Sequence, residues 1–191
     1  MQKADFSYYM PVEVFFGNDA IEKIGEYARK LRERAFLVVD NEMKKMGVLN
    51  KVTNLLTRVN MEIVCYDKVV PSPVYSQVYQ AAELAKMKRC DFVIGLGGGS
   101  CMDFAKGVAI AATHEEDFCQ FVYGGNSKVL LPTKRTLPIL AIPTTAGSGS
   151  QVTPYAVFVN PKFKFKDHHK KSLHFSKSSD SRSKTNNFHA A

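Results

Sequence analysis

The sequence lacks three features that would assign it to other classes of protein. Its four cysteines include no CxxC pair, so neither a zinc cluster nor a redox pair is expected, and we expect all four to be reduced. No apolar run reaches the ~20 residues that a membrane-spanning helix needs. The N-terminus also lacks the basic-then-apolar layout of a secretory signal. These absences favour a cytoplasmic protein without membrane association.

The excess of basic residues, a net charge of +8, is confined to one part of the chain. Residues 1–159 carry 18 lysines and arginines against 16 acidic residues, whereas residues 160–191 carry 8 against 2. The larger part is therefore almost neutral, and it shows no basic face with interleaved aromatic residues. Nucleic-acid binding is not expected, and binding driven by the basic segment is the weakest alternative.

What the sequence does contain is an alternation of short apolar runs with helical patterns. Strands are predicted at residues 12–16, 35–39, 62–66, 91–96, 137–142 and 155–159. Helices are predicted at residues 20–31, 48–59, 74–88 and 102–112, the first of them capped by Asn18. This alternation predicts an α/β fold, with a Rossmann-like, mostly parallel sheet and helices on both of its faces. Ligands of such sheets bind at the carboxyl ends of the strands.

One candidate binding loop lies in IGLGGGSCMDFAKG, residues 94–107, between a predicted strand and a predicted helix. Three glycines allow the backbone to approach a ligand closely, and the helix that follows directs its amides and its positive dipole end toward an anion. The pattern therefore predicts a pyrophosphate site, with a purely structural turn as the alternative. Asp103 would repel a phosphate placed directly against it, so we expect it to accept hydrogen bonds from backbone amides or from a ribose or substrate hydroxyl.

A second loop of small residues follows the strand at 137–142, in IPTTAGSGSQVTPYAV (residues 142–157). Its hydroxyls and bare backbone suit contacts with a nucleotide, although alone it reads as an ordinary connection. Asp40 closes the strand at 35–39. A carboxylate in this place often binds ribose hydroxyls and repels the extra phosphate of NADP, but it is equally suited to capping a helix.

Together these segments resemble the iron-containing (group III) alcohol dehydrogenase family, from about Val12 to about Pro161. Its most specific parts are GLGGGSCMDFAK and IPTTAGSGSQVTPYAV, in this order. In that family an N-terminal α/β domain, of the type shared with dehydroquinate synthase, binds NAD or NADP, and a helical C-terminal domain holds iron. The resemblance implies an NAD(P)-binding domain at residues 1–160. It implies that the helical metal domain is absent from this chain.

The resemblance also implies a set of cofactor-binding residues. They are Asp40, Ser72, Gly97, Gly98, Gly99, Ser100, Asp103, Thr144, Thr145, Ser148 and Thr153. The glycines and Ser100 would hold the pyrophosphate, Asp40 the adenosine ribose, and Ser72 would lie near the adenine. The threonines would line the cofactor further along. Gln151 and Ser72 depart mildly from the family pattern, which has Glu and Asn at these places.

Residues 161–191 differ from the rest of the chain, and the resemblance is expected to end before them. They are rich in serine, lysine and histidine without apolar periodicity, which predicts a disordered tail. The family's metal is held by one Asp and three His, beginning with an Asp-x-x-x-His pair, and no Asp here has a His at that spacing. His168, His169 and His174 lack the rigid support that a metal site needs, so no metal ligand and no catalytic residue is assigned.

By resemblance, the complete enzyme would convert a primary alcohol to an aldehyde by hydride transfer to NAD(P), reversibly, with iron as a second cofactor. This chain is expected to be inactive alone. It is also expected to form a homodimer, because a missing domain exposes apolar surface that promotes association. Asp40 favours NAD over NADP. The alternatives are a non-catalytic nucleotide-binding module and a relative of the polyol dehydrogenases or dehydroquinate synthase.

Overall fold

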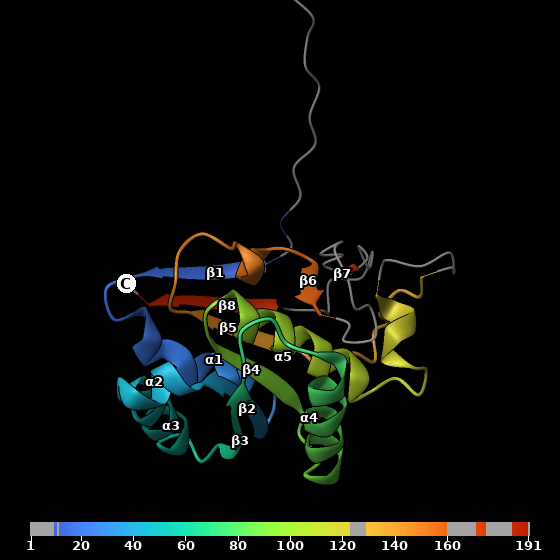
Figure 1. Ribbon diagram of the computed structural model, residues 1–191. Coiled ribbons are helices and arrows are strands. Elements are labelled where there is room, and N and C mark those ends of the chain that lie inside the picture. Colours follow the sequence, from blue (N-terminus) through green and yellow to red (C-terminus); the bar gives the residue numbers. More distant parts are fainter. Residues whose placement is uncertain (1–9, 11, 123–128, 160–170, 175–184, 191) are drawn as a thin grey trace, which may run out of the picture.

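A six-stranded parallel sheet with helices on both faces forms the body of the protein (Figure 1). The computed structural model describes residues 10, 12–122, 129–159, 171–174 and 185–190, the last two ranges for their backbone alone. The order of the strands is β1-β8-β5-β4-β2-β3, and every neighbouring pair is parallel. The predicted fold class is confirmed.

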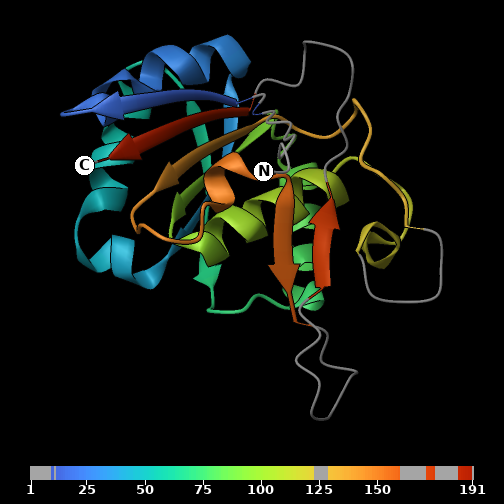
Figure 2. The same cartoon turned by 90° about the horizontal axis from the view of Figure 1, so that it is seen from above.

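The strands and helices have the following bounds. The sheet contains β1 (Val12–Gly17), β2 (Arg34–Asp40), β3 (Glu62–Val69), β4 (Phe92–Gly97), β5 (Ile139–Pro143) and β8 (Thr185–Ala190). The helices are α1 (Ile24–Leu31), α2 (Asn41–Lys45), α3 (Val48–Thr57), α4 (Tyr75–Met87) and α5 (Gly99–Ala111), with short 3-10 helices η1 (Ala20–Lys23), η2 (Phe118–Phe121) and η3 (Ser150–Val152). A separate antiparallel pair joins β6 (Tyr155–Phe158) to β7 (Lys171–His174) (Figure 2).

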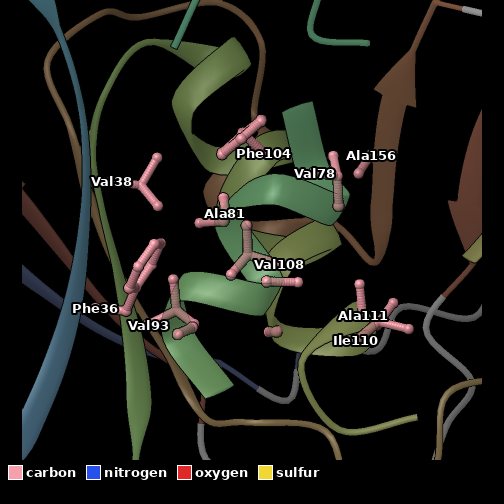
Figure 3. Close-up of a cluster of buried hydrophobic side chains, with 14 of the residues drawn as sticks. Phe36, Val38, Val78, Ala81, Val93, Phe104, Val108, Ile110, Ala111 and Ala156 are labelled. Carbon is pink, nitrogen blue, oxygen red and sulfur yellow. The ribbon is translucent and has the colours of Figure 1, made fainter. Parts of the chain in front are cut away.

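The central strand β2 shows why the sheet needs cover on both faces. Its inner residues 35–39 are all fully buried, and alternate side chains enter two different hydrophobic clusters. Phe36 and Val38 pack with α4 and α5, through residues such as Val78 and Phe104 (Figure 3). Residues 35, 37 and 39 pack with α1 and α3 on the other face. A continuous apolar strand is the pattern of a doubly covered parallel sheet.

One local expectation is wrong, and one predicted strand pairs outside the main sheet. Asn18 does not cap the first helix: Asp19 precedes η1 with a left-handed φ of 58°, its side chain makes no capping hydrogen bond, and the predicted helix begins as a 3-10 turn. The last predicted strand, β6, does form, but it pairs with β7 instead of the main sheet. Local propensity predicts that a strand exists without identifying its partner.

The segment at 160–191 differs from the expectation of disorder at two places. Lys171–His174 forms β7, and Thr185–Ala190 forms β8 between β1 and β5. His168 and His169 lie outside the described residues, as do the rest of 160–170, 175–184 and 191. Among the helices of the described ranges, none has the length and apolar character needed to cross a lipid bilayer. All four cysteines are free, as expected.

Candidate cofactor site

The carboxyl ends of three neighbouring strands bring the candidate residues together. The parallel register places Val39 of β2 opposite Leu96 of β4, and Gly97 of β4 opposite Pro143 of β5. The chain after β5 is tied directly to the end of β4, because the Thr144 amide donates to the Gly97 carbonyl at 3.0 Å. The two loops that the sequence singled out therefore begin side by side at one edge of the sheet.

Gly97 occupies a position that only glycine fits. Its φ of 142° lies in a region that other residues rarely adopt. A Cβ added there would lie 2.7 Å from Cys101 Sγ and 2.8 Å from Asp40 Oδ2. The close approach of β4 to the carboxylate at the end of β2 thus depends on the absence of a side chain at this residue.

The next two glycines pack against the second loop. A Cβ on Gly98 would lie 3.2 Å from Thr145 Oγ1, and one on Gly99 would lie 2.9 Å from Ser148 Oγ. The two loops are therefore in contact, with hydroxyl groups of one facing bare backbone of the other. Thr145 and Ser148 are exposed, so both hydroxyls lie at the surface of this edge.

Helix α5 directs its N-terminus into this region. It runs for 13 residues, from Gly99, with Gly98 as its N-cap and no capping side chain. The first backbone N–H groups of a helix have no intrahelical acceptor, and the helix dipole places partial positive charge there. Ser100 is half-buried at the first turn. Bare backbone, free amides and a hydroxyl form an arrangement that can bind a phosphate oxygen.

Asp40 is held by hydrogen bonds to both of its carboxylate oxygens. Oδ1 accepts from the Met43 amide at 3.0 Å, which caps α2, and Oδ2 accepts from Cys101 Sγ at 3.6 Å. Burial raises the pKa of the Cys101 thiol well above its usual range, so the thiol remains a donor. The helix-capping interpretation of Asp40 is therefore confirmed. It leaves lone pairs of this half-buried carboxylate available to a ligand.

Asp103 lies one turn into α5 and supports the second loop. Its Oδ1 accepts from the Ser150 hydroxyl at 2.6 Å, and its Oδ2 accepts from the Val157 amide at 2.9 Å. The expected hydrogen bond from a backbone amide is confirmed, whereas the hydroxyl that Asp103 binds belongs to Ser150 of the protein and not to a ligand. Asp103 therefore connects α5 to η3 and to β6 by hydrogen bonds.

Lys106 is a residue that the sequence reasoning did not select. Its ammonium is buried and donates to the Ser150 carbonyl at 2.7 Å, the Ser150 hydroxyl at 2.9 Å and the Tyr155 carbonyl at 2.5 Å. Burial lowers the pKa of Lys106 to about 8, opposed by the charge of Asp103 at 3.8 Å. A usable signal was present, because Lys106 is the only cation of this helix and lies three residues after its only acid.

The remaining predicted residues are less closely connected. Thr153 donates from its amide and its hydroxyl to the Ser150 carbonyl, at 3.3 and 3.5 Å. Thr144 Oγ1 is buried, and among the described residues it has no hydrogen-bond partner. Ser72 follows β3, is exposed and has a left-handed φ of 58°, a conformation that suits Asn better than Ser.

The residues present fit a dinucleotide. Gly97, Gly98 and Gly99 give a stretch of backbone without side chains, and an added Cβ at any of them would press on Asp40, Cys101 or the second loop. Thr144 Oγ1 offers a polar group with no partner in the described chain. The described residues do not offer a comparable site for a metal ion, because they contain no group of three or more His, Cys, Asp or Glu side chains that could hold one.

Comparison with known proteins assigns the chain to a family. The model of the iron-containing alcohol dehydrogenase family matches residues 11–178. The chain therefore belongs to this family. The match reaches beyond Pro161, so the expectation that family similarity ends there was wrong, and it includes β7. Both segments on which the resemblance was based lie inside the matched range.

Individual relatives agree with this assignment. The chain is 37% identical over 164 residues to a 1,3-propanediol dehydrogenase of Citrobacter freundii, covering 84% of this chain and 41% of that protein. It is 35% identical to a choline dehydrogenase of Bacillus subtilis, covering 84% and 40%. An archaeal halo-thermophilic alcohol dehydrogenase from a Red Sea brine pool superposes with a TM-score of 0.86 at 33% identity, covering 100% and 47%. The chain thus spans less than half the length of these relatives.

Proposed function

We propose that this chain is the nucleotide-binding part of an NAD(P)-dependent alcohol dehydrogenase, which interconverts primary alcohols and aldehydes. The observation that carries the proposal is the contact between the glycine loop and the second loop beside Asp40, at the carboxyl edge of the sheet. That edge is where open parallel sheets bind nucleotides. Family membership favours this reading over a polyol dehydrogenase or a dehydroquinate synthase relative.

Each residue of the site has a proposed role. Gly97, Gly98, Gly99 and the N-terminal amides of α5 bind the pyrophosphate, with Ser100 donating its hydroxyl. Asp40 accepts from the adenosine ribose hydroxyls and disfavours a 2′-phosphate, so NAD is preferred over NADP. Ser72, at the end of β3, lies toward the adenine. Thr144, Thr145, Ser148 and Thr153 line the nicotinamide half. Asp103 contributes indirectly, because both of its oxygens are already engaged.

The protein's part in the reaction is binding and orientation. When bound, the nicotinamide supplies the hydride acceptor or donor. The two loops would fix the direction in which the dinucleotide lies across the sheet edge. The iron implied by the family name has no ligand set among the described residues, so no step through it is assigned to them.

A second candidate is a nucleotide-binding module without chemistry of its own. The observation that favours it is that the groups gathered at the sheet edge, namely bare glycine backbone, hydroxyls and the fixed carboxylate of Asp40, are suited to binding. Titration calorimetry of the 191-residue chain with NAD+, NADP+ and ADP-ribose tests binding. A parallel assay follows reduction of NAD+ at 340 nm with 1,3-propanediol and Fe²⁺.

These two assays test nucleotide binding and turnover separately. We expect NAD+ and ADP-ribose to bind, NADP+ to bind more weakly, and no alcohol-dependent reduction of NAD+ by this chain alone. Turnover would contradict the non-catalytic reading. Absence of binding by all three nucleotides, in a chain whose circular dichroism shows a folded protein, would contradict the proposed nucleotide site itself.

A further inference from the structure

A buried ion pair links α5 to the second loop without facing the cofactor site directly. Lys106 and Asp103, three residues apart on the helix, both bind Ser150, the first residue of η3. The Ser150 hydroxyl accepts from the lysine and donates to the carboxylate. Together the pair also holds β6, through the Tyr155 carbonyl and the Val157 amide.

All three hydrogen-bond donors of Lys106 are used on this one connection. A buried ammonium is costly unless it is fully paired, so the arrangement is intolerant of any shift of Ser150 away from α5. Two of the three acceptors are atoms of Ser150 itself. The position of this serine relative to the helix is therefore set by Lys106.

Ser150 in turn carries the loop that contacts the glycines. Its amide donates to the Ser148 hydroxyl at 3.3 Å, and Ser148 is the residue against which Gly99 packs. A continuous series of contacts thus runs from Lys106, in the second turn of α5, through Ser150 and Ser148 back to the N-terminus of the same helix. The two candidate binding loops are closed against each other by this series.

We propose that Lys106 is a positioning residue, which holds the 144–150 loop against the glycine loop and so shapes the half of the site that receives the nicotinamide end of the dinucleotide. The proposal rests on the proposed function for its ligand. The claim that Lys106 holds the loop does not depend on the proposed function, and it can be tested without any nucleotide. Lys106 touches the protein only, so its effect on binding passes through Ser150.

The first experiment measures hydrogen–deuterium exchange of the unliganded chain. We expect Lys106→Met, which keeps the length of the side chain and removes its donors, to raise exchange in residues 144–157. Exchange in β4 is expected to stay unchanged. Ser150→Ala, a smaller change that removes only the hydroxyl, should raise loop exchange to a lesser degree. Lys86→Met, which replaces an exposed lysine of α4, is the control. Unchanged exchange of the loop in Lys106→Met and Ser150→Ala would overturn the proposal.

The second experiment compares two ligands by calorimetry. We expect Lys106→Met to weaken NAD+ binding about tenfold, because the loop that Lys106 holds would contribute fewer contacts to the nicotinamide half. AMP lacks the nicotinamide half, and its affinity should change less than twofold. An equal loss of affinity for NAD+ and AMP would indicate that the substitution loosens the whole binding site, and it would contradict the positioning role. If the unsubstituted chain binds neither ligand, the proposed function fails, while the exchange result still decides whether Lys106 holds the loop.

Discussion

The Cys101 thiol donates a hydrogen bond to Asp40 Oδ2 at 3.6 Å, across the gap between the start of α5 and the end of β2. A backbone amide holds the other carboxylate oxygen, so the acid is fixed from two sides. Gly97 permits this approach, since any side chain there would fill the space between them. The orientation of the acid is therefore set by the protein itself.

Replacing Asp40 with Asn should change cofactor preference more than stability. Asn keeps an oxygen that can cap α2 through Met43 but removes the charge that repels a 2′-phosphate. We expect the ratio of NAD+ to NADP+ affinity to fall by about tenfold, the scale of one lost charged contact. Calorimetry with both nucleotides measures it. Asp67→Asn, which removes an exposed acid of β3 paired with Lys44, is the control and should leave the ratio unchanged.

Gly97→Ala should both destabilise the chain and prevent nucleotide binding. The new Cβ meets Cys101 and Asp40 at under 3 Å, in a backbone conformation that alanine adopts poorly. Backbone strain of this kind costs on the order of 1–3 kcal/mol, before any displacement of neighbours. Gly47→Ala is the matched control, because Gly47 has a φ of 75° but no atom within 4 Å of its added Cβ. A comparison of urea unfolding midpoints that shows equal losses would contradict the role of the close approach.

Much of this fold and site could be predicted from local pattern. Phe36, Val38 and their neighbours form an apolar run that suits a doubly covered strand, and three glycines between strand and helix predict a close backbone approach. Helix capping by Asp40 was one of the two interpretations that the sequence left open. Each of these features depends on residues near in sequence.

The features that escaped prediction depend on distant partners. Lys106 finds its acceptors 44 and 49 residues away, and nothing local specifies them. The pairing of β6 with β7, and the insertion of β8 between β1 and β5, depend in the same way on which edges remain open after the rest of the sheet has formed. Side-chain periodicity indicates a strand but not its neighbours.

Arg89→Gly should stabilise the chain. Arg89 ends α4 with a left-handed φ of 52°, and two hydrogen bonds, from its own amide to the Lys86 carbonyl and from the Cys90 amide to the Ala85 carbonyl, form a Schellman motif. Glycine adopts this conformation without strain, so we expect a gain of about 0.5–1 kcal/mol in the free energy of unfolding. Chemical denaturation measures it.

The end of α3 provides the control for this change. Asn60 has a φ of 58° and the same pair of hydrogen bonds, from its amide to Thr57 and from the Met61 amide to Leu56. Asn tolerates the left-handed region better than Arg, so Asn60→Gly should change stability by less than half as much as Arg89→Gly. Equal gains at both sites would show that relief of strain at Arg89 is not the cause.

Lys106 should make the stability of the chain depend on alkaline pH in an unusual direction. Burial lowers its pKa to about 8 in the folded protein, against an ordinary value of 10.5. The unfolded chain therefore binds more protons between these two values, and the free energy of unfolding rises as the pH rises. Integrated from pH 7 to 9.5, this contribution is about 2 kcal/mol.

The measurement is a difference between two proteins, because tyrosines and cysteines also titrate in this range. Lys106→Met has no group to titrate at this position, so the stability of the original chain relative to this variant should increase from pH 7 to pH 9.5. Urea denaturation at both values gives the difference. A constant difference would show that the lysine keeps its ordinary pKa in the folded chain, and a decrease would show that its charged form is stabilised by Asp103 more than burial disfavours it.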